Sequence, residues 1–173
     1  GKVVRFHVLA NSDSEADQTL KLAVRDRVLQ EYGDLLETCT SKEETLAALK
    51  NAQQEISETA EAEVLAQGYT YPVRVSLVRE EFPFKKYGDL IFPAGVYDAL
   101  RIEIGEAKGK NWWCVLYTQM CYVDAAWGYS TEESHVRLQN TLTKEEFLVV
   151  SAMEQKKVTP KIKCRLVELW SER

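Results

Sequence analysis

Histidines, glycine-rich turns and long apolar runs are all scarce in this sequence of 173 residues. No apolar stretch approaches the roughly 18 residues that a membrane-spanning helix needs, so we expect a soluble chain. The chain has only two histidines, His7 and His135, which are too few for a typical zinc site of convergent ligands. No glycine-rich turn follows the first predicted strand, as a dinucleotide-binding loop requires. We therefore expect neither a metal nor a cofactor.

Clusters of basic residues are absent as well. The 22 Lys and Arg are scattered among 27 Asp and Glu, and the net charge is −5, so the basic patch of a nucleic-acid-binding protein is not present. The first residues lack the charged and apolar regions of a signal peptide. Because the sequence begins with Gly1 rather than Met, we expect an N-terminal export segment to be absent from it. With no internal repeat, residues 1–173 are expected to form a single domain.

The first half of the chain predicts one strand followed by helices. Apolar and polar residues alternate over residues 4–8, which is typical of a half-buried strand. Ser12, with an acidic residue three positions later, forms a capping box and predicts a helix that ends near Gly33. A second capping box at Ser41 predicts one helix of about 25 residues that ends at Gly68.

The second half predicts mainly strands. Residues 73–77 and 97–105 alternate in hydrophobicity, and residues 92–95 fit a turn between them. A further helix is predicted over residues 143–160 and a last strand over residues 162–170. The order β-α-α-β-β-(β)-α-β predicts an α+β fold, a single domain with a mainly antiparallel sheet and helices packed on one face.

The most distinctive segment contains two adjacent tryptophans and two cysteines. Trp112 and Trp113 precede Cys114, and Cys121 follows seven residues after Cys114. The two cysteines would form a disulfide if their Cα atoms came within about 7 Å. The short closed loop would then stabilise the fold by about 2–3 kcal/mol.

A reactive thiol at Cys114 is the alternative. A cysteine nucleophile needs an adjacent base and a third group that orients the base. His135 with Asp124 or Asn140 would supply these groups, although no glycine-rich nucleophile turn surrounds Cys114. This alternative predicts a cysteine-dependent hydrolase that acts on peptide or cell-wall amides.

Aromatic residues suggest a binding surface. Trp112 and Trp113 cannot both face one side of a strand, so at least one is exposed or is covered by a loop or a partner. Exposed large aromatics are typical binding anchors, whereas the alternative places one tryptophan in the core and the other over it. A surface of this kind would bind a protein partner or, as a cell-wall-binding module, a glycan. The aromatic residues that precede this segment could together form one exposed patch that marks a partner site: Phe82, Phe84, Tyr87, Phe92 and Tyr97.

A series of motifs resembles a known family. In order along the chain they are Ala10-Asn11-Ser12-Asp13-Ser14, Asp17-Gln18, Val24-Arg25-Asp26, Tyr87-Gly88-Asp89, Phe92-Pro93-Ala94-Gly95, Ala99-Leu100-Arg101-Ile102-Glu103-Ile104-Gly105-Glu106, Gly109, Asn111-Trp112-Trp113-Cys114-Val115-Leu116 and Cys121. From about Val4 to Asp124 the chain thereby resembles the stage II sporulation protein R family. It departs from the family at Lys110, where His is common, and at residues 117–120, where an aromatic residue and a Pro-rich stretch are expected.

The resemblance implies a non-enzymatic signal protein of endospore-forming Gram-positive bacteria, the Firmicutes. Such a protein is exported from the forespore into the space between the forespore and mother-cell membranes. The implied partner is a membrane-embedded aspartic protease, stage II sporulation protein GA, which matures a sigma-factor precursor. No catalytic residue is expected. The predicted partner-binding residues are Tyr87, Asp89, Phe92, Trp112, Trp113 and Tyr122, and the predicted disulfide joins Cys114 and Cys121.

Overall fold

A computed structural model describes residues 3–87, 90–117, 136, 140 and 142 of the chain. The elements are β1 (Val4–Leu9), α1 (Glu15–Glu37), α2 (Lys42–Asn51), α3 (Gln53–Ala66), β2 (Val73–Phe82), β3 (Lys85–Tyr87), β4 (Leu90–Phe92), β5 (Gly95–Ile104) and β6 (Asn111–Tyr117). The helix predicted over residues 143–160 and the strand predicted over residues 162–170 lie outside the described residues. None of the described helices is long and apolar enough to cross a membrane.

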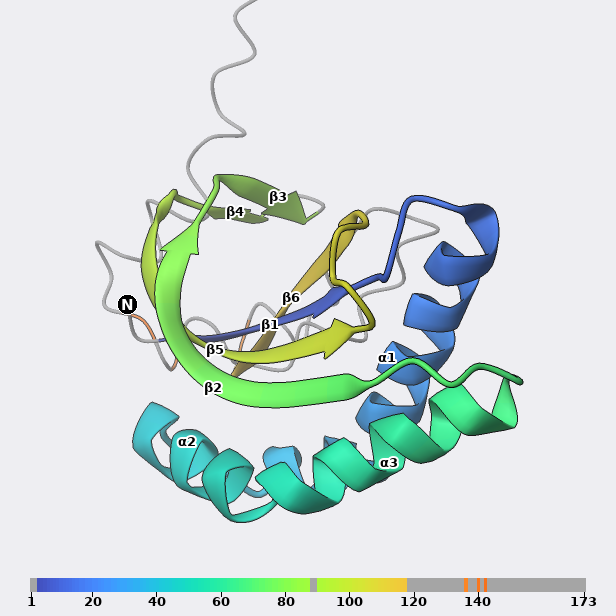
Figure 1. Cartoon of the computed structure of the whole chain (residues 1–173). Helices are drawn as coiled ribbons and strands as arrows, with labels where there is room; N and C mark the ends of the chain where they lie inside the picture. The colour runs from blue at the N-terminus through green and yellow to red at the C-terminus, as the bar shows by residue number, and fades with distance from the viewer. Residues whose placement is uncertain (1–2, 88–89, 118–135, 137–139, 141, 143–173) are drawn as a thin grey trace, which may run out of the picture.

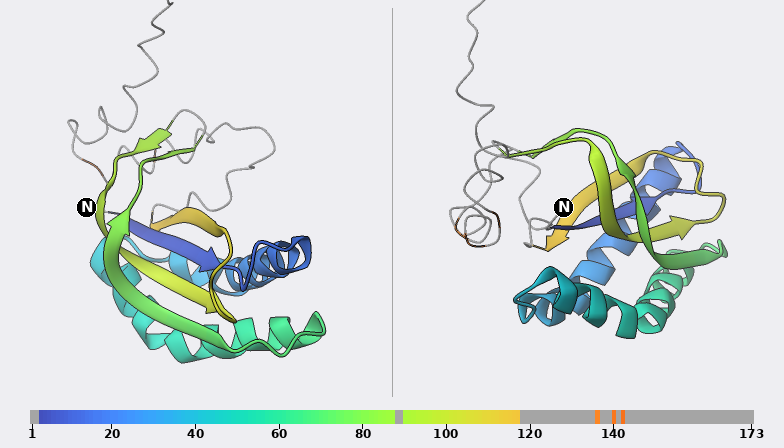
Figure 2. Two further views of the ribbon diagram at one scale, coloured as in Figure 1. Left: turned by 45° about the horizontal axis from the view of Figure 1, so that its top comes forward. Right: turned by 90° about the vertical axis from the view of Figure 1, so that its left-hand side faces the viewer.

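Four strands form one sheet in the order β2-β5-β1-β6. β1 pairs with β5 in parallel, while the β1–β6 and β2–β5 pairs are antiparallel. The three helices lie together beneath one face of this sheet, and the small β3–β4 hairpin lies near the far end of the curved β2–β5 pair (Figures 1 and 2). The predicted α+β fold with a mainly antiparallel sheet and helices on one face is confirmed.

The helix starts follow local capping chemistry. The Oγ of Ser14, not that of Ser12, caps α1 by accepting the Asp17 N–H at 3.1 Å. The cap predicted at Ser12 is therefore wrong, because the Ser12 hydroxyl donates to the Asp17 carboxylate at 2.5 Å instead. The cap predicted at Ser41 is confirmed, since its Oγ accepts the Glu44 N–H at 3.1 Å.

The single long helix predicted from Ser41 to Gly68 is two helices. The backbone leaves helical geometry at Ala52 (φ −87°, ψ 0°), where α2 ends and α3 begins. The side chain of Gln53 donates to the Val75 carbonyl of β2 at 3.0 Å. The bend keeps Leu49 and Ile56, on either side of it, almost fully buried, so both helices pack against the same core.

The largest core lies between the helices and the sheet. Its central residues are almost inaccessible to solvent: Phe6, Val8, Val24, Ile56, Ala60, Leu100, Ile102 and Ile104. A second, smaller core lies on the other face of the sheet and contains Val3, Phe82, Phe92, Tyr97, Ala99 and Val115. Because β1 is central and both faces are covered, Arg5 and His7 are 0% and 3% exposed. The prediction of a half-buried first strand is wrong for this reason.

The loop after β1 is fastened to the loop after β5. Asn11 accepts the Glu106 N–H at 2.9 Å, and Asp13 accepts the Lys110 N–H at 2.6 Å. Gly105 adopts φ +59°, and a Cβ there would overlap the Asn11 side chain. A side chain at Gly105 would therefore not fit between the two loops. These motif residues hold the loop after β1 and the loop after β5 together at one end of the sheet.

Candidate functional site

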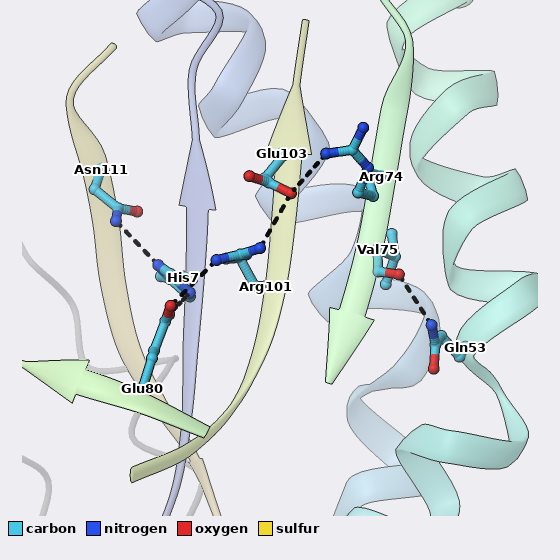
Figure 3. Close-up of polar contacts among 8 residues, drawn as sticks. All are labelled: His7, Gln53, Arg74, Val75, Glu80, Arg101, Glu103 and Asn111. Atoms are coloured by element: carbon cyan, nitrogen blue, oxygen red, sulfur yellow. Dashed lines mark hydrogen bonds and ion pairs between the residues drawn. The ribbon is translucent and has the colours of Figure 1, made fainter. Parts of the chain in front are cut away.

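A row of polar side chains crosses the sheet face opposite the helices. His7 lies on β1, Glu80 on β2, Arg101 and Glu103 on β5, and Asn111 on β6. Figure 3 shows them pointing toward one another across neighbouring strands. These five residues, called the polar row below, occupy alternate positions of strands whose other side chains enter the helix-side core. The sheet therefore places polar groups far apart in sequence side by side.

His7 uses both ring nitrogens within this row. The Asn111 side-chain amide donates to Nδ1 of His7 at 2.9 Å, and Nε2 of His7 lies 2.6 Å from a Glu80 carboxylate oxygen. An acceptor at Nδ1 places the proton of the neutral ring on Nε2, which faces the Glu80 carboxylate without forming a well-aligned hydrogen bond to it. In the neutral form Nδ1 is hydrogen-bonded to Asn111 and Nε2 carries the proton, so neither nitrogen is available to accept a proton from a substrate.

Burial lowers the pKa of His7 to about 4, and the nearby charges of Arg101 and Arg5 add to this effect. Glu80 would favour the protonated ring through its short contact at Nε2. The same Glu80 carboxylate is shared with the Arg101 guanidinium at 3.2 Å, which reduces its effect on His7. Neutral His7 is therefore the native form at pH 7.

The charged members of the row alternate in sign. Arg101 contacts Glu80 at 3.2 Å and Glu103 at 3.4 Å, and Arg74 contacts Glu103 from β2 at 3.6 Å. The side chains of Glu80, Arg101 and Glu103 are each less than one-third exposed. Partly buried ions need compensating charges, and here each carboxylate has an arginine. With Arg74 added to the five residues of the polar row, two arginines balance the two carboxylates.

Aromatic rings flank one end of the polar row. The Trp113 ring stacks on His7 with centroids 5.1 Å apart and planes 16° apart, and Phe82 meets both rings edge-on. The Arg5 guanidinium lies 4.9 Å from the Phe82 centroid and 5.2 Å from that of Phe92. Stacked and cation–π contacts of this kind fix ring orientation, so this end of the sheet face is well packed.

The two tryptophans lie on opposite faces of β6 and are both half-buried. Trp112 packs edge-on against Phe6 in the helix-side core, and Arg25 lies 4.9 Å over its ring. Trp113 faces the polar row, and Lys85 of the β3–β4 hairpin lies 5.2 Å over it. The prediction that the two rings face opposite sides agrees with this placement, and each ring contributes to packing.

The other predicted partner-binding residues are placed differently. Phe92 is 2% exposed, so its ring is not a surface anchor in this structure. Tyr87 ends β3, while Asp89 and Tyr122 lie outside the described residues. Phe84, one of the aromatic residues predicted to form a patch, is 52% exposed at the base of the hairpin. Phe82, Phe92 and Tyr97 of the same set are buried, so the predicted exposed patch of these aromatic residues is wrong for these three.

The proposed nucleophile and its partners are not brought together in the described part of the chain. Cys114 is 2% exposed in the helix-side core, and His7 lies on the other face of the sheet. Asn140 is exposed, while His135, Asp124 and Cys121 lie outside the described residues. In the same part of the chain, no group of three or more His, Cys, Asp or Glu is placed to hold a metal ion.

Comparisons with known proteins point to one family. The family model described as stage II sporulation protein R matches residues 1–127. Stage II sporulation protein R of Bacillus subtilis (strain 168) is 32% identical over 181 aligned residues, which cover 99% of this chain and 81% of that protein. No solved structure matches the chain. The resemblance inferred from the sequence motifs is confirmed by the family match and by the relative.

Proposed function

Because the chain belongs to the stage II sporulation protein R family, we propose that it is an exported signal that activates a membrane-embedded aspartic protease. The partner is stage II sporulation protein GA of the mother cell, and the place of action is the space between the forespore and mother-cell membranes. The consequence of activation is maturation of a sigma-factor precursor. The role in sporulation is common to the family, and the signalling step is the proposal.

The observation that carries the proposal is an aromatic surface at the base of the β3–β4 hairpin. We call Phe84, Lys85 and Trp113 the hairpin-base surface. Phe84 is 52% exposed, and the neighbouring Lys85 ammonium covers the half-buried Trp113 ring at 5.2 Å. Exposed aromatic and cationic side chains beside a rigid, packed core are typical of residues that dominate binding energy.

The signal acts by binding and performs no bond-breaking of its own. His7 is the only histidine in the described residues; its Nδ1 is hydrogen-bonded to Asn111, and its Nε2 lies 2.6 Å from a Glu80 carboxylate oxygen. A binding protein can shift a partner's equilibrium only by its difference in affinity for the two states. The hairpin-base surface would therefore bind the active state of the protease more tightly than the inactive state.

We also propose that Cys114 pairs with Cys121, as an exported protein permits. Two observations support this pairing: Cys114 is in a disulfide-bonded state, whereas Cys39 is a free cysteine. Cys114 is the middle residue of β6, and Cys121 comes four residues after the last residue of that strand in the sequence.

A matched pair of surface substitutions tests the signalling proposal. Phe84→Ala removes the exposed ring from the hairpin-base surface, and Leu65→Ala removes a 63% exposed side chain from α3 on the helix side. Neither change opens a core, so both variants are expected to fold as the unsubstituted protein does. In sporulating cells, Phe84→Ala should reduce processing of the sigma-factor precursor, measured by immunoblot, while Leu65→Ala should leave it unchanged.

Circular dichroism and thermal unfolding of both purified variants would check that folding is intact. The proposed surface is wrong if Phe84→Ala, folded and present at the normal level, supports normal processing. Binding of the purified protein to the protease in detergent separates the two steps. A variant that binds normally but does not activate would place the activating contact elsewhere.

A further inference from the structure

The outer edge of β2 is open over its second half. β2 is an edge strand of the described sheet, and β5 pairs with it from Val73 to Phe82 on one side only. Figures 1 and 2 show α3 beneath the first half of β2, with the strand then curving away from the helices. An open edge is a template for another strand.

The alternation of hydrogen bonds between β2 and β5 shows which backbone groups of β2 point away from β5. Gly105 donates its N–H to the Pro72 carbonyl at 2.8 Å, in the same register that pairs Val73 with Ile104. Antiparallel strands alternate between residues bonded to the partner and residues that point away. The backbone groups that point away from β5 are those of Val73, Val75, Leu77, Arg79 and Glu81.

Only the start of this edge is occupied. Gln53 of α3 donates to the Val75 carbonyl at 3.0 Å (Figure 3). Within the described residues, no hydrogen bond reaches the outward backbone groups of Leu77, Arg79 or Glu81. The next outward residue is Pro83, which has no N–H and ends the edge.

Two opposite charges lie on this open stretch. Arg79 and Glu81 are both exposed, and their side chains share one face of the strand. Neither forms an ion pair with another described residue, although Arg79 lies opposite Asp98 of β5 and its charge helps to lower the pKa of that carboxyl group. A strand with a basic and an acidic residue two positions apart is complementary to an antiparallel copy of itself.

We propose that β2 pairs with β2 of a second copy of this chain, through a two-fold axis near Glu80. In this register Arg79 lies opposite Glu81 of the second copy, and Glu81 lies opposite its Arg79. Both pairs are of the hydrogen-bonded kind, so about four backbone hydrogen bonds and two cross-strand ion pairs join the copies. The two sheets then become one continuous sheet with helices on the same face.

Repulsion between like charges and the Gln53 hydrogen bond disfavour the neighbouring registers of the β2–β2 pair. A two-fold axis at Arg79 would place the two arginines directly opposite each other, which destabilises a strand pair. An axis at Val78 would require the Val75 carbonyl, which Gln53 already occupies. The chosen axis brings the two Glu80 residues together, but each carboxylate is held by His7 and Arg101 in its own sheet.

Charge reversal in the full chain tests the proposal. A short strand edge buries little area, so the dimer is expected to be weak and is best measured by sedimentation equilibrium from about 10 µM to about 1 mM. Arg79→Glu and Glu81→Arg should each weaken self-association about tenfold, because attraction becomes repulsion at both pairs. The double variant R79E/E81R restores complementarity and should recover the dimer.

Mixing the two single variants is the most discriminating experiment. Each repels itself, yet the R79E chain is complementary to the E81R chain, so an equimolar mixture should form a heterodimer. Arg79→Pro, which removes an outward N–H together with the charge of both ion pairs, should abolish association. The proposal would be overturned if the unsubstituted chain stayed monomeric over the whole concentration range, or if charge reversal did not affect the dimer. Arg79 and Glu81 would then serve to prevent the edge of β2 from pairing with other strands.

Discussion

Acidification should weaken the fold through His7. In the unfolded chain this histidine takes up a proton near its ordinary pKa of 6.5, whereas in the folded protein its pKa is about 4. Between these values the unfolded state binds a proton that the native state does not. The stabilisation is therefore fully present above pH 6.5 and is lost as the pH falls toward 4.

The size of the effect follows from the difference between the two pKa values. A pKa lowered from 6.5 to about 4 corresponds to about 3 kcal/mol of unfolding free energy at 1.36 kcal/mol per unit. No reduction for solvent screening is needed, because His7 is 3% exposed. The charged groups that face it are Arg5 on its own strand, Glu80 on β2 and Arg101 on β5.

The assay compares the unsubstituted protein with His7→Gln, whose side-chain amide is polar but does not titrate. Urea unfolding of both proteins at intervals from pH 7 to pH 4 gives the difference in their unfolding free energies, in which the other carboxylates largely cancel. That difference should shrink by about 3 kcal/mol as the pH falls. A constant difference, or one that grows on acidification, would show that Glu80 stabilises the protonated ring and would refute the reasoning.

Three further outcomes are expected. Asp17→Ala should lower the unfolding free energy by about 1–3 kcal/mol in urea titrations, because its carboxylate accepts two side-chain hydrogen bonds in a site that is 4% exposed. Gly109→Ala would place a Cβ against a backbone carbonyl of the loop after β1 and should cost at least about 2 kcal/mol, whereas Gly95→Ala, which meets only an ordinary contact, should cost much less. Iodoacetamide should label Cys39 in the folded, oxidised protein and leave Cys114 unlabelled until reduction; mass spectrometry that finds Cys114 labelled before reduction would contradict the disulfide.

The parts of the fold that follow from neighbouring residues could be predicted from the sequence. The Ser41 cap depends on a residue three positions away, and the alternation in residues 97–105 marks β5 directly. At the start of α1 two capping sites overlap, at Ser12 and at Ser14. Long-range contacts decide between the two capping sites. The loop after β5 holds Asn11 in place, and Asn11 in turn donates a hydrogen bond to Asp17.

The polar row could not be predicted for the same reason. Nothing in the alternation of β1 distinguishes a solvent-facing His7 from a buried one, because its burial depends on strand order. Glu80 and Asn111 come within reach of His7 only when β2 and β6 take their places in the sheet. The family motifs identify the family of the chain. Several motif residues, such as Asn11 and Gly105, hold the loop after β1 against the loop after β5.

Trp112 and Trp113 are adjacent in sequence but belong to different parts of the structure. Trp112 closes the helix-side core against Phe6, so its replacement reports mainly on folding. Trp113 stacks on His7 and lies under Lys85, so its replacement would change the polar row and the hairpin-base surface together. A loss of signalling in a Trp113 variant would therefore not distinguish a lost contact from a disturbed sheet. Phe84 packs against no described ring and is the residue at which binding can be tested separately from stability.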